Sequence, residues 1–263
     1  RRVSKFKFIN YVHFPISSWD YSATLISMSD LVITCSDSIK TQIKSYDHQD
    51  KLKIEVLPNF SRIVGSDIAA NDSDSNPLFE LLDTTLNIIC VGHLSEVKNQ
   101  KLLIEILSAI RKNFPELKIQ LLLLGKDNCS EGKNLASLQE QTRHYAVEDC
   151  VHFIGVVKDP TPYYRRSHIF ALPSLKEGMP LVLLEAMSLG LACIVTPVDG
   201  NIEVIVDNRN GLLRDLESFQ AGMESLVADS DLRERLGKAA LLDTQTKFSR
   251  SKYQERFLGF LSL

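Results

Sequence analysis

Cysteine is scarce in this chain, and its spacing fits neither disulfides nor a zinc site. Five cysteines occur among 263 residues, an odd number, and none belongs to a Cys-x-x-Cys pair. Cys35, Cys90 and Cys193 lie in or beside strand-like runs, where a free cysteine behaves as a small hydrophobic residue. The pattern predicts a protein of the reducing cytoplasm rather than a disulfide-bonded secreted one.

The chain also lacks a charge excess and long hydrophobic runs. Lys and Arg number 30 against 33 Asp and Glu, which gives a formal net charge of −3 and no overall field to hold nucleic acid or an anionic membrane. No run reaches the ~18 uncharged apolar residues that a membrane span needs. Lys5 and Lys7 interrupt the start of the chain, which excludes a signal peptide there. The hydrophobic share of 44% excludes a disordered chain.

Several common catalytic motifs are missing. No strand-like run is followed by the G-x-G-x-x-G of nicotinamide or flavin enzymes, and there is no G-x-S-x-G elbow of hydrolases. The six histidines never occur at metal-ligand spacing. The sequence Asp72-Ser73-Asp74 lies in the polar segment 66–76, where a solvated loop is the favoured interpretation. We therefore expect neither a cofactor nor a bound metal.

What the sequence does have is a regular alternation of strand-like and helical patterns. Runs of β-branched and aliphatic residues predict strands at 8–12, 31–34, 53–57, 87–91, 118–124, 151–154, 169–172 and 192–196. Helical spacing of apolar residues predicts helices at 99–113, 134–147, 180–189, 218–228 and 231–248. This order is typical of βαβ units, so the predicted fold class is α/β with a doubly wound parallel sheet.

Doubly wound sheets bind ligands at the carboxyl ends of their strands, which directs attention to the loop at 173–180. Gly178, Met179 and Pro180 precede a helix whose free N–H groups and dipole suit a phosphate, with Pro180 expected at its first position. Glu177 stands just before this terminus, and Glu185 follows after seven residues in an apolar helix. Glu185 either binds a ligand or pairs with a buried lysine or backbone group.

A second loop carries a possible phosphate partner. His93 and Lys98 follow the predicted strand at 87–91. A lysine at that place can neutralise a diphosphate as a point charge, and an imidazole can donate a hydrogen bond. The alternative is a solvated loop that caps the next helix.

Taken together, these loops resemble the retaining glycosyltransferases of family four, which have the GT-B fold of two facing Rossmann-like domains. The resemblance covers most of residues 30–250 and depends on four stretches in the family's order. They are 91–99 (VGHLSEVKN), 173–187 (PSLKEGMPLVLLEAM), 197–205 (PVDGNIEVI) and the pair 31–36 (LVITCS) with 56–59 (VLPN).

The resemblance implies roles for individual residues. Glu177 would hold hydroxyls of a donor sugar, Glu185 would bind the ribose, and Lys98 with His93 would stabilise the departing diphosphate. His13 resembles a family histidine that faces the sugar, although a plain core or loop histidine is a competing interpretation. The predicted catalytic residues are Glu177, Lys98 and His13. The predicted donor-binding residues are Gly92, His93, Lys98, Gly155, Val156, Glu177, Gly178, Met179, Pro180, Leu181 and Glu185, with Gly155 and Val156 beside the base.

The chain departs from the family pattern at three places. The family usually has Arg where His93 stands, which implies weaker or pH-dependent phosphate binding. Asp199 replaces a common glycine and would place a carboxylate near an anion site. The acceptor-side domain is short, so we expect that the chain, which starts at Arg1, is a fragment of a longer enzyme.

The resemblance also implies a division of the chain. Residues 1–58 would be the C-terminal part of the acceptor-side domain, 59–84 a hinge or linker, and 85–248 the nucleotide-sugar donor domain. Residues 249–263 would form a helix that packs back on the first domain.

The predicted function is transfer of a sugar from a nucleotide-diphosphate sugar to a glycan or lipid-linked acceptor with retention of anomeric configuration, in surface polysaccharide synthesis. The predicted enzyme has no nucleic-acid partner and at most peripheral membrane contact through the missing N-terminal part. Two alternatives stay open. One is a nucleotide-sugar-binding module without transfer activity, and the other is a GT-B-fold sugar-nucleotide epimerase.

Overall fold

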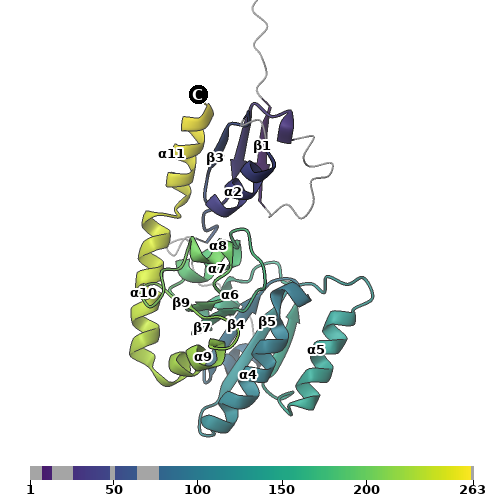
Figure 1. Ribbon diagram of the computed structural model, residues 1–263. Coiled ribbons are helices and arrows are strands. Elements are labelled where there is room, and N and C mark those ends of the chain that lie inside the picture. The colour runs from purple at the N-terminus through teal and green to yellow at the C-terminus, as the bar shows by residue number, and fades with distance from the viewer. Residues whose placement is uncertain (1–7, 14–25, 48–50, 64–76, 262–263) are drawn as a thin grey trace, which may run out of the picture.

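Two parallel sheets form the framework of the protein, and the predicted α/β class is confirmed. The computed structural model describes residues 8–13, 26–47, 51–63 and 77–261, so the prediction for the polar segment 66–76 lies outside the described residues. The smaller sheet has the order β1-β2-β3, with bounds Ile9–Val12, Leu31–Thr34 and Ile54–Val56. The larger sheet has the order β6-β5-β4-β7-β8-β9 (Figure 1), with bounds Val151–Gly155, Ile119–Leu124, Leu86–Val91, Ile169–Leu172, Ala192–Val195 and Leu212–Leu213.

The larger sheet is buried on both faces, which explains its continuous apolar strands. All six residues of β5 are buried, and alternate positions belong to separate hydrophobic cores. Leu121 and Leu123 pack in the core that contains α4 (Gln100–Asn113) and α9 (Phe219–Ala228). Leu122 and Leu124 pack on the opposite side with α7 (Leu181–Ser188). Both faces therefore exclude water, as a parallel sheet of this kind requires.

The strand order places a topological switch point between β4 and β7. From β4 the chain moves outward through β5 and β6, then returns to the other side of β4 with β7, β8 and β9. The loops that leave β4 and β7 consequently diverge at the carboxyl edge, which is where such sheets leave a crevice for a ligand. The remaining helices of this half are α3 (Pro77–Leu82), α5 (Lys133–His144), α6 (Thr161–Arg165), α8 (Asp199–Ile202) and α10 (Ser230–Thr246).

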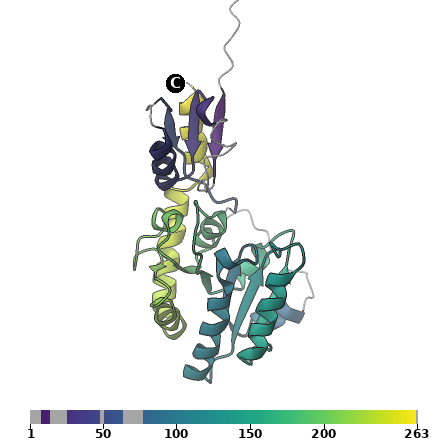
Figure 2. The ribbon, with the colours of Figure 1, turned by 45° about the vertical axis from the view of Figure 1, so that its right-hand side comes forward.

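The smaller sheet is covered by a helix on each face. Val32 packs with Ile39 and Ile43 of α2 (Asp37–Tyr46). The alternate residues Leu31 and Ile33 pack with aromatic side chains of α11 (Arg250–Leu261). Figures 1 and 2 show α10 along the larger sheet and α11 beside the smaller one. The C-terminal part of the chain thus contacts both sheets.

A carboxylate from the half of the protein that contains the larger sheet caps a helix of the half that contains the smaller sheet. Glu203, just after α8, accepts hydrogen bonds from the backbone N–H groups of Asp37 and Ser38, each at 2.9 Å. These groups belong to the first turn of α2, where N–H groups have no partner inside the helix. Burial raises the pKa of the Glu203 carboxyl, against the opposing effect of the two amides. The bond joins residues 166 positions apart.

We predict that Glu203→Ala lowers the free energy of unfolding by about 1–2 kcal/mol, since both N–H groups lose their acceptor. Urea unfolding followed by circular dichroism measures the change. Glu217→Ala is the control because that side chain is exposed, and it should change stability by less than about 0.5 kcal/mol. Equal effects of the two substitutions would show that the contact between the halves contributes nothing.

The structure contains helices that sequence patterning did not predict. α2 and α3 lie outside the five predicted helices, and α3 falls in the range 59–84 expected to be a hinge or linker. Phe79 and Leu82 of α3 are buried in the core with α7. Within the described residues, no helix combines the length and apolar character needed to cross a bilayer.

Candidate functional site

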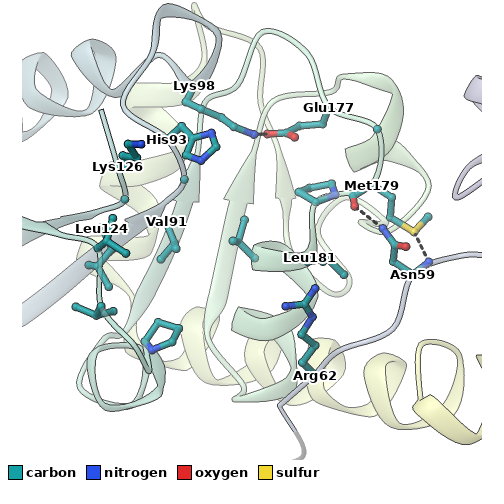
Figure 3. A pocket seen from close by; sticks show the side chains of 18 of the residues that line it. Asn59, Arg62, Val91, His93, Lys98, Leu124, Lys126, Glu177, Met179 and Leu181 are labelled. Atoms are coloured by element: carbon teal, nitrogen blue, oxygen red, sulfur yellow. Dashed lines mark hydrogen bonds and ion pairs between the residues drawn. The ribbon is translucent and has the colours of Figure 1, made fainter. Parts of the chain in front are cut away.

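A cavity of about 840 Å³ opens between the two halves, at the carboxyl ends of the strands beside the switch point. It collects residues from both sheets and from the segment that joins them (Figure 3). The lining residues are His13, Asn59, Arg62, Val91, Gly92, His93, Lys98, Leu124, Gly125, Lys126, Gly155, Val156, Val157, Pro160, Glu177, Gly178, Met179, Pro180, Leu181 and Val182. All predicted site residues except Glu185 are among them.

An ion pair between the loops that follow β4 and β7 spans the cavity. Lys98 Nζ lies 2.5 Å from Glu177 Oε1, and the two side chains point toward each other in Figure 3. The Glu177 side chain is 7% exposed and that of Lys98 is 21% exposed, so water screens the pair weakly. The two predicted catalytic groups therefore neutralise one another.

Local backbone geometry sets the position of Lys98. It ends the 3-10 turn Glu96–Lys98, and Asn99 follows in the left-handed region with a φ of 52°. The turn is fixed to the opposite loop because Leu175 N–H donates to the Val97 carbonyl at 2.8 Å. Lys98 and Glu177 thus approach each other on loops that are themselves joined through the backbone.

The helix that follows Glu177 points its N-terminus at the cavity. α7 begins at Leu181, one residue later than predicted, because Pro180 has a ψ of 121° and is still extended. Pro180, Leu181 and Val182 all line the cavity. The first turn of a helix offers free N–H groups and the positive end of its dipole, an arrangement suited to phosphate.

The backbone beside this helix is closely packed, where the loop of Gly178 meets the residue after β1 on one side and α8 on the other. A Cβ atom added to Gly178 would lie 2.4 Å from the His13 carbonyl oxygen, and one added to Gly200 would lie 2.3 Å from the Gly178 carbonyl oxygen. Neither contact leaves room for a side chain. The smaller sheet therefore meets the Glu177 loop directly at Gly178.

Asn59 holds the same loop from the side of the joining segment. Its side-chain amide donates to the Met179 carbonyl at 2.9 Å, and its backbone N–H contacts Met179 Sδ at 3.2 Å (Figure 3). Asn59 is buried. Asn59 belongs to the stretch 56–59 that contributes to the family resemblance, but it is not among the predicted site residues, because no spacing signal connects positions 120 residues apart.

The opposite wall continues the pairing of β4 with β5 beyond the strands. A Cβ atom added to Gly125, whose φ is 144°, would lie 2.0 Å from the Gly92 carbonyl oxygen. Leu94 N–H donates to the Lys126 carbonyl at 2.9 Å. The loops that carry His93 and Lys126 are therefore in contact, and both side chains reach the cavity.

Asp127 anchors this wall. Its carboxylate accepts hydrogen bonds from the N–H groups of Cys129 and Leu135 and from the Asn134 side chain, at 2.7–2.8 Å. These bonds, that from Leu135 first, lower the pKa of Asp127. Asp127 is thus held as a structural carboxylate and does not line the cavity.

Three further predicted residues take distinct positions at the cavity. Gly155 has a φ of 74° with no atom within 4 Å of a built Cβ, and Val156 beside it is 74% exposed. His13 stacks on Tyr11 with ring centroids 4.1 Å apart, and burial lowers the pKa of its imidazole. All three residues line the same cavity, and their contacts with a sugar and a base stay predictions.

Glu185 lies outside this lining, further along α7 than Val182. Its Oε2 atom is 3.4 Å from the Tyr164 hydroxyl, which can donate to it. Burial raises the pKa of Glu185, while Arg62 and the Tyr164 hydroxyl act in the opposite direction. The partner of Glu185 is therefore a tyrosine and, over a longer range, an arginine of the cavity. Asp199 does not line the cavity either.

Positive charge predominates in the lining. Arg62, Lys98 and Lys126 face a single carboxylate, Glu177. In a chain with a net charge of −3, this concentration of cations favours an anionic ligand. Among the described residues, no group of three or more His, Cys, Asp or Glu side chains is placed to hold a metal ion, and metal independence stays a prediction.

Comparisons with known proteins identify a family and similar sequences. A family described as "Glycosyl transferases group 1" matches residues 79–242. An uncharacterized glycosyltransferase of Haemophilus influenzae is 30% identical over 161 residues, covering 60% of this chain and 43% of the relative. The capsular polysaccharide biosynthesis glycosyltransferase CapM of Staphylococcus aureus is 27% identical over 224 residues, covering 83% and 57%. The chain thus spans about half the length of the curated relatives it matches.

Solved structures show the same fold at low sequence identity. HepE of Anabaena, solved in complex with UDP-glucose, superposes with a TM-score of 0.83 and 18% identity, covering 97% of this chain and 71% of that one. The sucrose-phosphate synthase of Thermosynechococcus elongatus superposes with a TM-score of 0.79 and 19% identity, covering 98% and 67%.

Proposed function

The chain belongs to the group 1 glycosyl transferases, and from this we propose that its cavity binds a nucleoside-diphosphate sugar whose sugar is transferred to an acceptor. The observation that carries the proposal is the Lys98–Glu177 pair at the switch point, in a cavity that the N-terminal end of α7, Arg62 and Lys126 also line. A carboxylate can accept hydrogen bonds from sugar hydroxyls and an ammonium can pair with a phosphate, and a nucleoside-diphosphate sugar presents both groups next to each other.

The chemistry of departure explains the choice of residues. When the bond between the anomeric carbon and the diphosphate breaks, the electron pair leaves with the phosphate oxygen, and negative charge grows there. Lys98 and the first turn of α7 line the cavity in which we propose that the diphosphate binds, and preorganised charge of this kind stabilises a transition state. Glu177 accepts hydrogen bonds from sugar hydroxyls. The acceptor hydroxyl oxygen forms the new bond on the face that the diphosphate leaves, and its proton passes to the departing phosphate oxygen, so the anomeric configuration is retained.

The other predicted residues receive roles from their places in the cavity. Gly155 and Val156 flank the base, and the exposed Val156 side chain offers it an apolar surface. His13 faces the sugar from the smaller sheet.

We propose that catalysis proceeds without a protein-bound metal, because the cations of the lining supply the charge. The relatives named for capsular polysaccharide and amylovoran synthesis support a role in surface polysaccharide synthesis, with a glycan or lipid-linked acceptor. Five free thiols favour the cytoplasm.

Titration calorimetry with UDP, GDP and ADP and with their glucose derivatives tests the donor site. We expect micromolar or tighter binding of one diphosphate and of its sugar derivative, and weaker binding of the free sugar. Proton NMR of the reaction with an acceptor mixture then reports the anomeric configuration of the product. Binding without any cleavage of the donor would favour the binding-module alternative, and formation of an epimeric nucleotide sugar would favour the epimerase.

Glu185 provides a separate prediction about the ribose. Glu185→Gln should weaken the binding of a nucleoside diphosphate about tenfold, because a charge-assisted hydrogen bond to ribose hydroxyls is lost. The affinity for the matching 2′,3′-dideoxynucleotide should change less than threefold. Tyr164→Phe is the control, because it removes the partner of Glu185 but keeps the carboxylate. Wild-type affinity in Glu185→Gln would contradict the ribose assignment.

A further inference from the structure

Two of the three cations that line the cavity already interact with carboxylates. Lys98 is paired with Glu177, and Arg62 acts on Glu185. Lys126 has no acidic partner in the part of the chain that the structure describes, and its side chain is exposed. Its neighbour in sequence, Asp127, is occupied by the bonds that anchor the wall. Lys126 is therefore the cation whose charge is available to a ligand.

The register of β4 and β5 fixes what stands beside Lys126. Val91 lies beside Leu124 in the sheet, and Leu94 lies beside Asp127 in a bridge beyond it. The same offset between the two segments places His93 beside Lys126. Neighbouring parallel strands are about 4.8 Å apart, and side chains at matched positions point to the same face. Both residues line the cavity, so this face is the one that meets the ligand.

His93 alone is a weak group for a diphosphate. An imidazole ring reaches a phosphate oxygen through one ring N–H, whereas a diphosphate with a departing sugar develops charge on several oxygens. We propose that Lys126 and His93 act as one phosphate-binding pair, in which Lys126 supplies the charge and His93 the directed hydrogen bond. The proposal rests on the donor site proposed above and adds a residue to it.

The pairing has a consequence for where charge can be placed. Because the two positions are matched in register, an arginine at position 93 would bring its guanidinium to the same part of the cavity as the Lys126 ammonium. Charge at either position should then serve the ligand, whereas charge elsewhere on β5 should not. Lys118 tests this contrast, since it precedes β5 and lies at the opposite edge of the sheet.

The experiment measures affinities for UDP, GDP and ADP and for their monophosphates in four proteins. These are the wild type, Lys126→Gln, Lys118→Gln and the double variant Lys126→Gln/His93→Arg. Lys126→Gln should bind its diphosphate about 10- to 100-fold more weakly, with a smaller loss for the monophosphate. Lys118→Gln should stay within threefold of the wild type, and the double variant should recover to within about threefold.

Each departure from this pattern has a defined meaning. Unchanged affinity in Lys126→Gln, at an unchanged melting temperature, overturns the assignment of Lys126 while leaving the donor site intact. An equal loss of affinity in Lys118→Gln would show a general effect of charge on the protein and would overturn the proposal. A double variant that binds diphosphate no more tightly than Lys126→Gln would show that the lost affinity does not come from charge at this pair, and this too would overturn the proposal. If the wild type binds none of the three diphosphates, the donor site itself fails, and the Lys126 assignment fails with it.

Discussion

Lys98→Met is expected to lower the free energy of unfolding of the ligand-free protein by about 3 kcal/mol. The substitution removes the ammonium that lies 2.5 Å from Glu177 and leaves a carboxylate whose side chain is only 7% exposed. Breaking a buried pair from one side is costly because the remaining charge is neither solvated nor neutralised. Chemical unfolding at pH 7 measures the loss.

The double variant Lys98→Met/Glu177→Gln separates charge from packing. With both charges removed, stability should return to within about 1 kcal/mol of the wild type, because no unpaired ion is left in the site. The matched control is Lys133→Met, which breaks an ion pair whose two side chains are 72% and 65% exposed and should cost less than about 1 kcal/mol. If Lys98→Met cost no more than Lys133→Met, the pair would be as well screened as a surface pair.

Glu177→Gln is expected to move binding and turnover in opposite directions. Free nucleoside diphosphate should bind about tenfold tighter, because Lys98 is released from its partner and one negative charge next to the phosphates is gone. Cleavage of the nucleotide sugar should fall by about 10²- to 10³-fold, because the amide holds the sugar hydroxyls less firmly as charge develops. Calorimetry gives the first quantity, and the initial rate of diphosphate release from the donor gives the second.

Lys98→Met is the counterpart in this comparison. It should weaken both diphosphate binding and donor cleavage, since the ammonium acts on the ground state and more strongly on the departing phosphate. A Glu177→Gln protein that binds diphosphate more weakly than the wild type would contradict the competition between phosphate and carboxylate for Lys98. In that case Glu177 would act by positioning Lys98.

The α/β fold class could be predicted from the sequence because the strands of the larger sheet are buried on both faces. The run 119–124 is apolar at every position except Gln120, and a strand that is buried on both faces of a parallel sheet calls for such a run. α2 could not be predicted from the sequence because most of its residues are not buried. Only Ile39 and Ile43 of its residues are buried, and its polar majority hides the helical period until the smaller sheet is there to receive it.

The site was predictable where chemistry is local in sequence. Glu177 and the α7 terminus are neighbours along the chain, and the glycine and proline between them mark the turn. Lys126 and Asn59 were not predictable in this way. Lys126 gains its place from the register of β4 with β5, and Asn59 from a contact across 120 residues. For Glu185 the sequence predicted only part of the environment. A carboxylate in an apolar helix indicated burial, but it did not identify the tyrosine that contacts it.

The close backbone contacts at Gly178 and Gly200 limit which positions of the pocket can be changed by design. The walls formed by Val156, Leu181 and Val182 consist of side chains, which a library of variants can enlarge, shrink or recharge to admit another sugar or base. At Gly178 and Gly200 the adjoining atoms are carbonyl oxygens of other loops, and even a methyl group has nowhere to go. Directed evolution of donor preference should therefore leave these two codons fixed and spend its diversity on the walls.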